Sequence, residues 1–115
     1  MSGWERVTLT TGPRGMSPNT AKVLKNGLSF SPDLFEGRDL GKLRLEPYIK
    51  KEERLIGFKV SRYGYKPRRP ENANVIHLNC KGTLKLLDPA PTKGGVYPAR
   101  REKDMLVVDF SEEAS

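Results

Sequence analysis

Apolar and polar residues alternate in several short stretches of this chain, and a period of two predicts β-strands. The clearest stretch is residues 55–60, in which Ile56, Phe58 and Val60 fall on one face and Lys59 falls on the other. An alternation of this kind is typical of a strand with one buried face.

The preceding stretch predicts the hairpin partner of this strand. Leu43 and Leu45 alternate with polar residues over 42–48, and the charged residues 50–54 form a solvated turn. The two stretches are therefore expected to pair antiparallel. Pro47 lacks a backbone N–H and restricts the first of these strands to the edge of a sheet or ends it there.

Further strands are predicted on both sides of this hairpin. Asn26-Gly27 favours a tight turn, so the residues around it are read as a hairpin. The predicted strands outside the central hairpin cover residues 4–11, 21–25, 28–31, 74–79, 96–100 and 105–110, the last two joined by a charged turn at 101–104.

Two short helices complete the predicted elements. Ser31 followed by Pro32 is a helix start, and the helix is expected to end at Gly37. Cys80, Leu84 and Leu87 have helical spacing before Pro89. The predicted core contains Leu43, Leu45, Ile56, Phe58, Val60, Ile76, Leu78, Leu84, Leu87, Val107 and Phe110.

The order of these elements indicates an internal repeat. Residues 21–60 and 74–110 each run from a strand through a short helix into a hairpin, and residues 61–73 form a basic arm between them. We therefore predict a β-rich α+β fold, built from two strand-helix-strand-strand units within a single domain over residues 1–110. Residues 111–115 are expected to be a disordered acidic tail.

The first unit resembles the swapped-hairpin family of DNA-binding transcription regulators, of the AbrB and MraZ type. The resemblance lies in Gly27-Leu-Ser-Phe-Ser-Pro-Asp-Leu-Phe35 and in residues 41–60, and more faintly in residues 74–110. It implies a dimeric regulator that lays basic side chains from a β-rich surface onto DNA.

The middle of the chain carries the whole net charge of +7. Residues 38–69 hold eleven basic and four acidic groups, whereas residues 1–37 hold four and three and residues 70–115 hold six and seven. A local excess of this kind attracts a polyanion to one surface. A surface whose charge serves only solubility is the alternative interpretation.

The basic arm is the clearest candidate binding site. Its four basic residues interleave with two tyrosines around a glycine and two prolines, so we expect a flexible segment that contacts phosphates and stacks on bases. Folding of one or both rings over the sheet edge is an equal alternative for the tyrosines. The predicted nucleic-acid-binding residues are Arg62, Tyr63, Tyr65, Lys66, Arg68 and Arg69 in the arm, and Lys50, Lys51 and Arg54 in the neighbouring turn.

The sequence contains few residues that are suited to catalysis. His77 is the sole histidine and Cys80 the sole cysteine, and one such pair is too few ligands for a zinc site. Cys80 at an apolar helical position indicates packing rather than a nucleophile. Thr92-Lys93-Gly94-Gly95 lacks the spacing of a phosphate loop. We therefore predict no enzyme activity, no metal and no cofactor.

The sequence also predicts the cellular compartment and the partner. A single cysteine fits a reducing compartment, and no apolar run is long enough for a secretion signal or a bilayer span, so a cytoplasmic protein without a membrane partner is expected. The sequence predicts a small basic nucleic-acid-binding protein, a bacterial or phage regulator or accessory factor, with DNA favoured over RNA. The resemblance to the swapped-hairpin family implies a homodimer. The alternative is a protein-interaction module, such as a phage-encoded inhibitor that docks on an acidic host protein.

Overall fold

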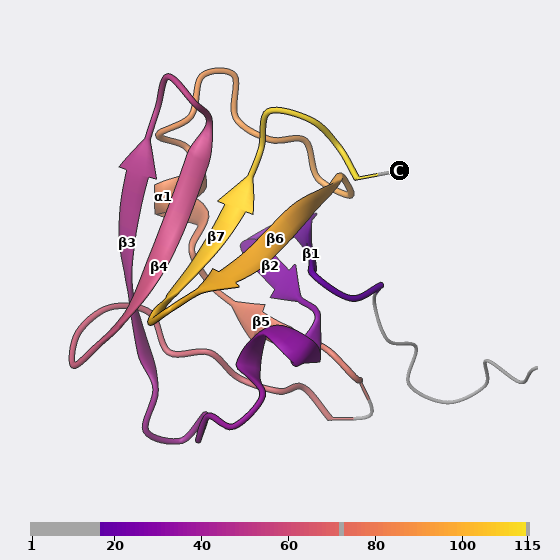
Figure 1. Ribbon diagram of the computed structural model, residues 1–115. Helices are drawn as coiled ribbons and strands as arrows, with labels where there is room; N and C mark the ends of the chain where they lie inside the picture. Colours follow the sequence, from indigo (N-terminus) through magenta and orange to yellow (C-terminus); the bar gives the residue numbers. More distant parts are fainter. Residues whose placement is uncertain (1–16, 72, 115) are drawn as a thin grey trace, which may run out of the picture.

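Seven antiparallel strands form one curled sheet in the computed structural model, which describes residues 17–71 and 73–114 (Figure 1). The order across the sheet is β3-β4-β7-β6-β1-β2-β5, and the sheet curls so that β7 and β6 lie in front of β1 and β2. The strands are β1 (Thr20–Leu24), β2 (Gly27–Phe30), β3 (Arg44–Lys50), β4 (Leu55–Ser61), β5 (Ile76–Leu78), β6 (Val96–Glu102) and β7 (Met105–Asp109).

The predicted α+β class is wrong, because the protein is almost entirely β. Its helical elements in the described part of the chain are a 3-10 turn, η1 (Pro32–Phe35), and one turn of α-helix, α1 (Lys81–Leu84). The curled sheet encloses the core by itself, so neither helix forms a layer. Each helical element contributes two buried residues to the interior.

The central hairpin agrees with its prediction. β3 and β4 pair antiparallel from Lys50 opposite Leu55 to Arg44 opposite Ser61. β3 lies at one edge of the sheet, as Pro47 predicts. Arg54 adopts a positive φ of 55° at the end of the turn, a conformation that few residues other than glycine adopt.

The first hairpin is also present, with its turn shifted by one residue. Leu24 lies opposite Gly27, so Lys25 and Asn26 occupy the turn. Gly27 is needed for a different reason than turn geometry. A Cβ atom there would lie 1.9 Å from the carbonyl oxygen of Leu78, because the end of β5 crosses closely over this position.

Two strand pairs join the first half of the chain to the second half. β2 pairs antiparallel with β5, and β4 pairs antiparallel with β7. Each of these pairs joins a strand of the first half to the strand at the same place in the second half. The β3–β4 and β6–β7 hairpins therefore form a continuous four-stranded surface.

One aromatic cluster lies at the centre of the interior. The Phe30 ring contacts Phe58 edge-on with centroids 5.8 Å apart, and it contacts Phe35 edge-on at 5.7 Å. Phe30 and Phe58 are fully buried. The geometry is the favoured one for aromatic pairs, and it joins η1 to the end of β2 and the middle of β4. Every predicted core residue is buried except Val60, which is half-buried against the core, and Val107 is buried but lies outside the core cluster.

Residues 65–68, called here the closing segment, join the two edges of the curled sheet. Tyr65 exchanges two backbone hydrogen bonds of 2.8 Å with Leu45 of β3. Arg68 exchanges two, of 2.8 and 3.0 Å, with His77 of β5. Pro67 lies between these pairs and is fully buried. The prediction of a flexible arm is therefore wrong for residues 65–68, which form part of the wall of the curled sheet.

The two ends of the chain bear differently on the predictions. The strand predicted at residues 4–11 lies outside the described residues. In the acidic tail, the backbone N–H of Ala114 donates to the carbonyl oxygen of Val96 at 2.7 Å. The tail thus contacts the start of β6, and its disorder stays a prediction.

We expect Gly64→Ala to destabilise the protein by at least about 2 kcal/mol. Gly64 has a φ of 109°, and a Cβ atom there would lie 2.2 Å from the carbonyl oxygen of Leu45. Both the backbone conformation and the contact with β3 would be disturbed just before the closing segment. Denaturant unfolding measures the change. Gly82→Ala is the control, because no atom lies within 4 Å of a Cβ there, and equal stability of the two variants would contradict the account.

Candidate nucleic-acid interface

Five basic side chains gather where the closing segment meets the sheet, and we call this surface the basic edge. Arg62 lies in the bend after β4, and Lys66 and Arg68 flank the buried Pro67. Pro67 and Tyr65 turn towards the interior, so the residues between and after them turn outward. All members of the basic edge are exposed: Arg44, Arg62, Lys66, Arg68 and Arg69.

Arg44 is the member of the basic edge that sequence reasoning missed. It lies on β3 directly opposite Ser61, the residue before Arg62. The hairpin register contains this information, because Lys50 opposite Leu55 also places Arg44 opposite Ser61. Extending the predicted pairing along both strands would have found it.

No member of the basic edge forms an ion pair with an acidic side chain of the described residues. Two ion pairs are present among residues 17–71 and 73–114, Lys50–Glu53 at 3.7 Å and Arg100–Glu102 at 2.5 Å. Neither involves a residue of the basic edge. Its five cationic side chains also make no side-chain hydrogen bond with the described residues. Their charge is therefore available to an external anion.

The two tyrosines of the arm have different environments. Tyr63 is 74% exposed. Tyr65 packs against the core, and its hydroxyl shares a 2.7 Å hydrogen bond with the hydroxyl of Thr83 in α1. The fold-back interpretation thus holds for Tyr65, and only Tyr63 is placed to stack on a ligand.

A tight bend presents Arg62 and Tyr63 to solvent. The Ser61 hydroxyl accepts a hydrogen bond from the backbone N–H of Tyr63 at 3.3 Å, and it donates to Glu46 at the same distance. Gly64 then brings the backbone against Leu45. The tip of the bend is consequently held from both sides while its side chains point away.

The predicted residues of the 50–54 turn do not join the basic edge. They lie at the other end of β4, about 20 Å from Ser61 at roughly 3.3 Å per residue. Lys50 and Lys51 are exposed there. Arg54 has a structural role, because its guanidinium donates to the carbonyl oxygens of Phe110 at 3.2 Å and Pro89 at 2.8 Å. It ties the turn to the chain beyond β7 and has little freedom to bind a phosphate.

His77 and Cys80 have perturbed pKa values with clear causes. Burial lowers the pKa of His77, and the nearby positive charge of Arg68 lowers it further. Burial raises the pKa of the Cys80 thiol to about 12. Cys80 is fully buried, so it packs as predicted and holds its proton at neutral pH.

Neither a metal-binding cluster nor a membrane-spanning helix is found among the described residues. No group of three or more histidine, cysteine, aspartate or glutamate side chains within them is arranged to hold a metal ion. Within the same residues, no helix has the length and apolar character needed to cross a membrane.

Comparisons of the chain with protein-family models, with curated proteins and with solved structures find no match. The resemblance to the swapped-hairpin regulators therefore stays a prediction, and the function must be argued from the surface itself.

We expect the pKa of His77 to lie below the usual histidine value and to rise in Arg68→Gln. The rise is partial because burial, the larger cause, remains. NMR titration reads this directly, since His77 is the sole histidine of the chain. Arg69→Gln is the matched control and should leave the pKa in place; an equal rise in both variants would contradict the assignment.

The lowered pKa of His77 also makes the stability of the protein depend on pH. The folded state favours the neutral imidazole, so its pKa lies below the unfolded value of about 6.5. Stability is therefore expected to be greater above this pH and to fall as the pH drops through the interval between the two pKa values. His77→Gln should remove this component of the pH dependence.

Proposed function

We propose that this protein binds the phosphate backbone of nucleic acid through the basic edge. The observation that carries the proposal is the set of five exposed cationic side chains, none of which forms an ion pair with the described residues. Each phosphate that they neutralise releases counterions, and this release favours binding independently of base sequence.

The architecture of the basic edge supports this proposal. The closing segment holds two of the five cations, Lys66 and Arg68, on a hydrogen-bonded backbone, so less conformational entropy is lost on binding than for a free arm. Tyr63 stands beside them with most of its ring surface in solvent. Its position permits stacking on a base that is not paired.

A reducing compartment such as the cytoplasm fits this function. Nucleic acids are accessible there, and the buried Cys80 is a free thiol without a disulfide. An acidic protein could use the same cations. Nucleic acid is favoured because Tyr63 adds an exposed aromatic ring to the charge, a combination typical of nucleic-acid-binding surfaces.

We expect binding to a short duplex to weaken with salt at a log–log slope of about −4 to −5, if all five cations contact phosphates. Arg68→Ala with Arg69→Ala should make the slope shallower by about 1 to 2 units for all sequences alike. Fluorescence anisotropy at several salt concentrations measures the slope.

Lys51→Ala with Lys93→Ala is the matched control for this experiment. It removes the same charge from two exposed residues outside the basic edge, and it should leave the slope unchanged. An equal change of slope in both double variants would mean that net charge alone acts. Absence of binding to DNA and RNA at low salt would reject the proposal and leave an acidic protein partner or solubility.

A further inference from the structure

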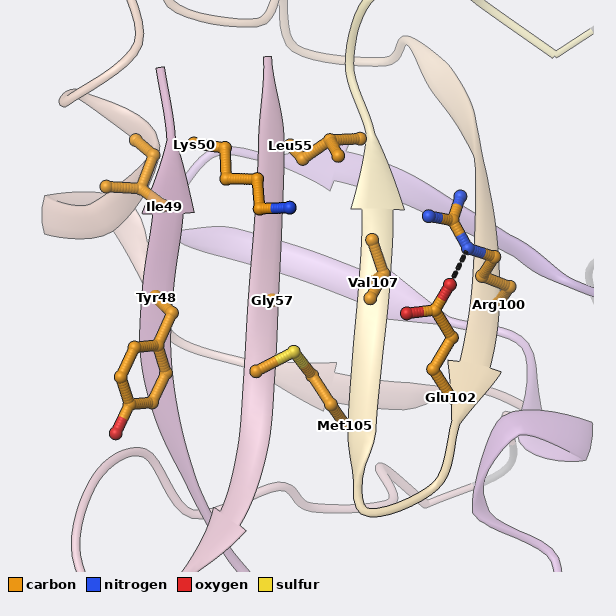
Figure 2. Close-up of a pocket in the computed structure, with 9 residues that line it drawn as sticks. All are labelled: Tyr48, Ile49, Lys50, Leu55, Gly57, Arg100, Glu102, Met105 and Val107. Carbon is orange, nitrogen blue, oxygen red and sulfur yellow. Dashed lines mark hydrogen bonds and ion pairs between the residues drawn. The ribbon is translucent and has the colours of Figure 1, made fainter. Parts of the chain in front are cut away.

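The outer face of the four-stranded surface carries a hollow with a volume of about 340 Å³ (Figure 2). Most of its lining comes from positions of β3, β4, β7 and β6 that point away from the core, and Ile49 of β3, which packs against the core, adds to its rim. Figure 2 shows Tyr48 on one side, Arg100 with Glu102 on the other, and Met105 and Val107 between them.

The absence of a side chain at Gly57 shapes the floor of this hollow. Gly57 lies opposite Val107 at the centre of the β4–β7 pairing. Met105 extends across towards Gly57, and a Cβ atom at this glycine would lie 2.6 Å from the Met105 sulfur. Together with Leu55, these residues make an apolar floor in a face that is otherwise polar. Val107 is buried, yet it belongs to this outer floor and not to the core cluster.

Cationic groups flank the apolar floor on both sides. Lys50 extends over β4, and Arg100 lies on β6. Each has an acidic neighbour, but both ion pairs are exposed, and Arg100 uses only its Nε atom. Exposed pairs of this kind are weak, so both cations remain able to bind an anion that approaches the hollow.

We propose that the hollow binds an unpaired base of single-stranded nucleic acid, with the flanking phosphates on Lys50 and Arg100. This inference rests on the proposed function and adds that the partner is a single strand. A base offers the flat apolar surface that the floor and the half-exposed Tyr48 ring can cover, while the phosphates on either side carry the negative charge that the two cations attract.

The hollow and the basic edge lie on one continuous path. β4 leads from Gly57, opposite Tyr48, to Ser61, opposite Arg44. This distance is about 13 Å at roughly 3.3 Å per residue, and Tyr63 follows two residues later. Lys59, which is exposed, shares the outer face between the two positions. A nucleic-acid strand on this path would meet an exposed tyrosine at each end, with Lys59 and Arg44 between them, over a length that fits several nucleotides. It would also pass the carboxylate of Glu46, which lies opposite Lys59 and accepts hydrogen bonds from the Tyr48 and Ser61 hydroxyls.

A duplex and an acidic peptide fit the hollow less well. The bases of a duplex are stacked on each other, so neither Tyr48 nor Tyr63 could reach a free ring face. An acidic peptide would satisfy the cations but leave the apolar floor without a matching surface. Both are outcomes of the test below.

The test uses the whole chain and single-stranded oligothymidylate of about 10 nucleotides, a length within the usual site sizes. We expect the Met105 methyl signal and the backbone amide of Gly57 to shift in NMR spectra of the wild-type protein on binding. Tyr48→Ala should weaken binding about 5- to 100-fold, as expected for one lost stacked base, and Tyr48→Phe should restore it. Leu86→Ala is the control, because it removes another exposed apolar side chain and should have no effect.

Three outcomes overturn the inference in distinguishable ways. If oligothymidylate binds while the Met105 and Gly57 signals stay in place, the base site is rejected and the proposed function stands. Tighter binding of a duplex of equal length than of the single strand also rejects the base site alone. If no nucleic acid binds, whether or not polyglutamate does, the proposed function fails and the base site fails with it.

Discussion

The fold depends on four backbone hydrogen bonds that the closing segment makes with the two edge strands. A curled sheet with open edges exposes rows of unpaired N–H and C=O groups, which invite pairing with other chains. Tyr65 and Arg68 satisfy part of both edges, with Leu45 and His77 as partners. The buried Pro67 between them adds an apolar anchor, and it needs no hydrogen bond for a backbone N–H. A segment that its composition marks as flexible is thereby held in the wall of the sheet.

Features of the fold that depend on neighbouring residues could be predicted from the sequence, whereas the closure of the sheet could not. The β3–β4 hairpin was predictable because its strands are neighbours and their alternation is complementary. The α+β class was wrong because Ser31-Pro32 and the spacing around Cys80 signal helix starts without indicating length, and each helical element makes a single turn. Closure joins residues such as Leu45 and Tyr65 through the curl of the whole sheet, which no local periodicity records.

The same distinction between local features and contacts of distant segments applies to the candidate site. Composition identified the cations of residues 62–69, and hairpin register contained the position of Arg44. The structural role of Arg54 was not accessible, because its acceptors belong to Pro89 and Phe110, far along the chain. The different environments of Tyr63 and Tyr65 depend on Gly64 and on Thr83, which meet only in the folded protein.

Almost everywhere in the sheet, the residues that stabilise the fold lie on one face and the residues available for binding lie on the other. Inward positions such as Phe58 and Val108 form the core, whereas outward positions such as Tyr48 and Lys59 are free to carry recognition. The closing segment is the exception, because alternate side chains within it serve both purposes: those of Tyr65 and Pro67 pack inward, while those of Lys66 and Arg68 face solvent. An anion bound there would lie on a backbone that holds both edges together. Since a ligand stabilises the state that binds it, binding at the basic edge would also strengthen the closure of the sheet, and in this segment folding and recognition are linked.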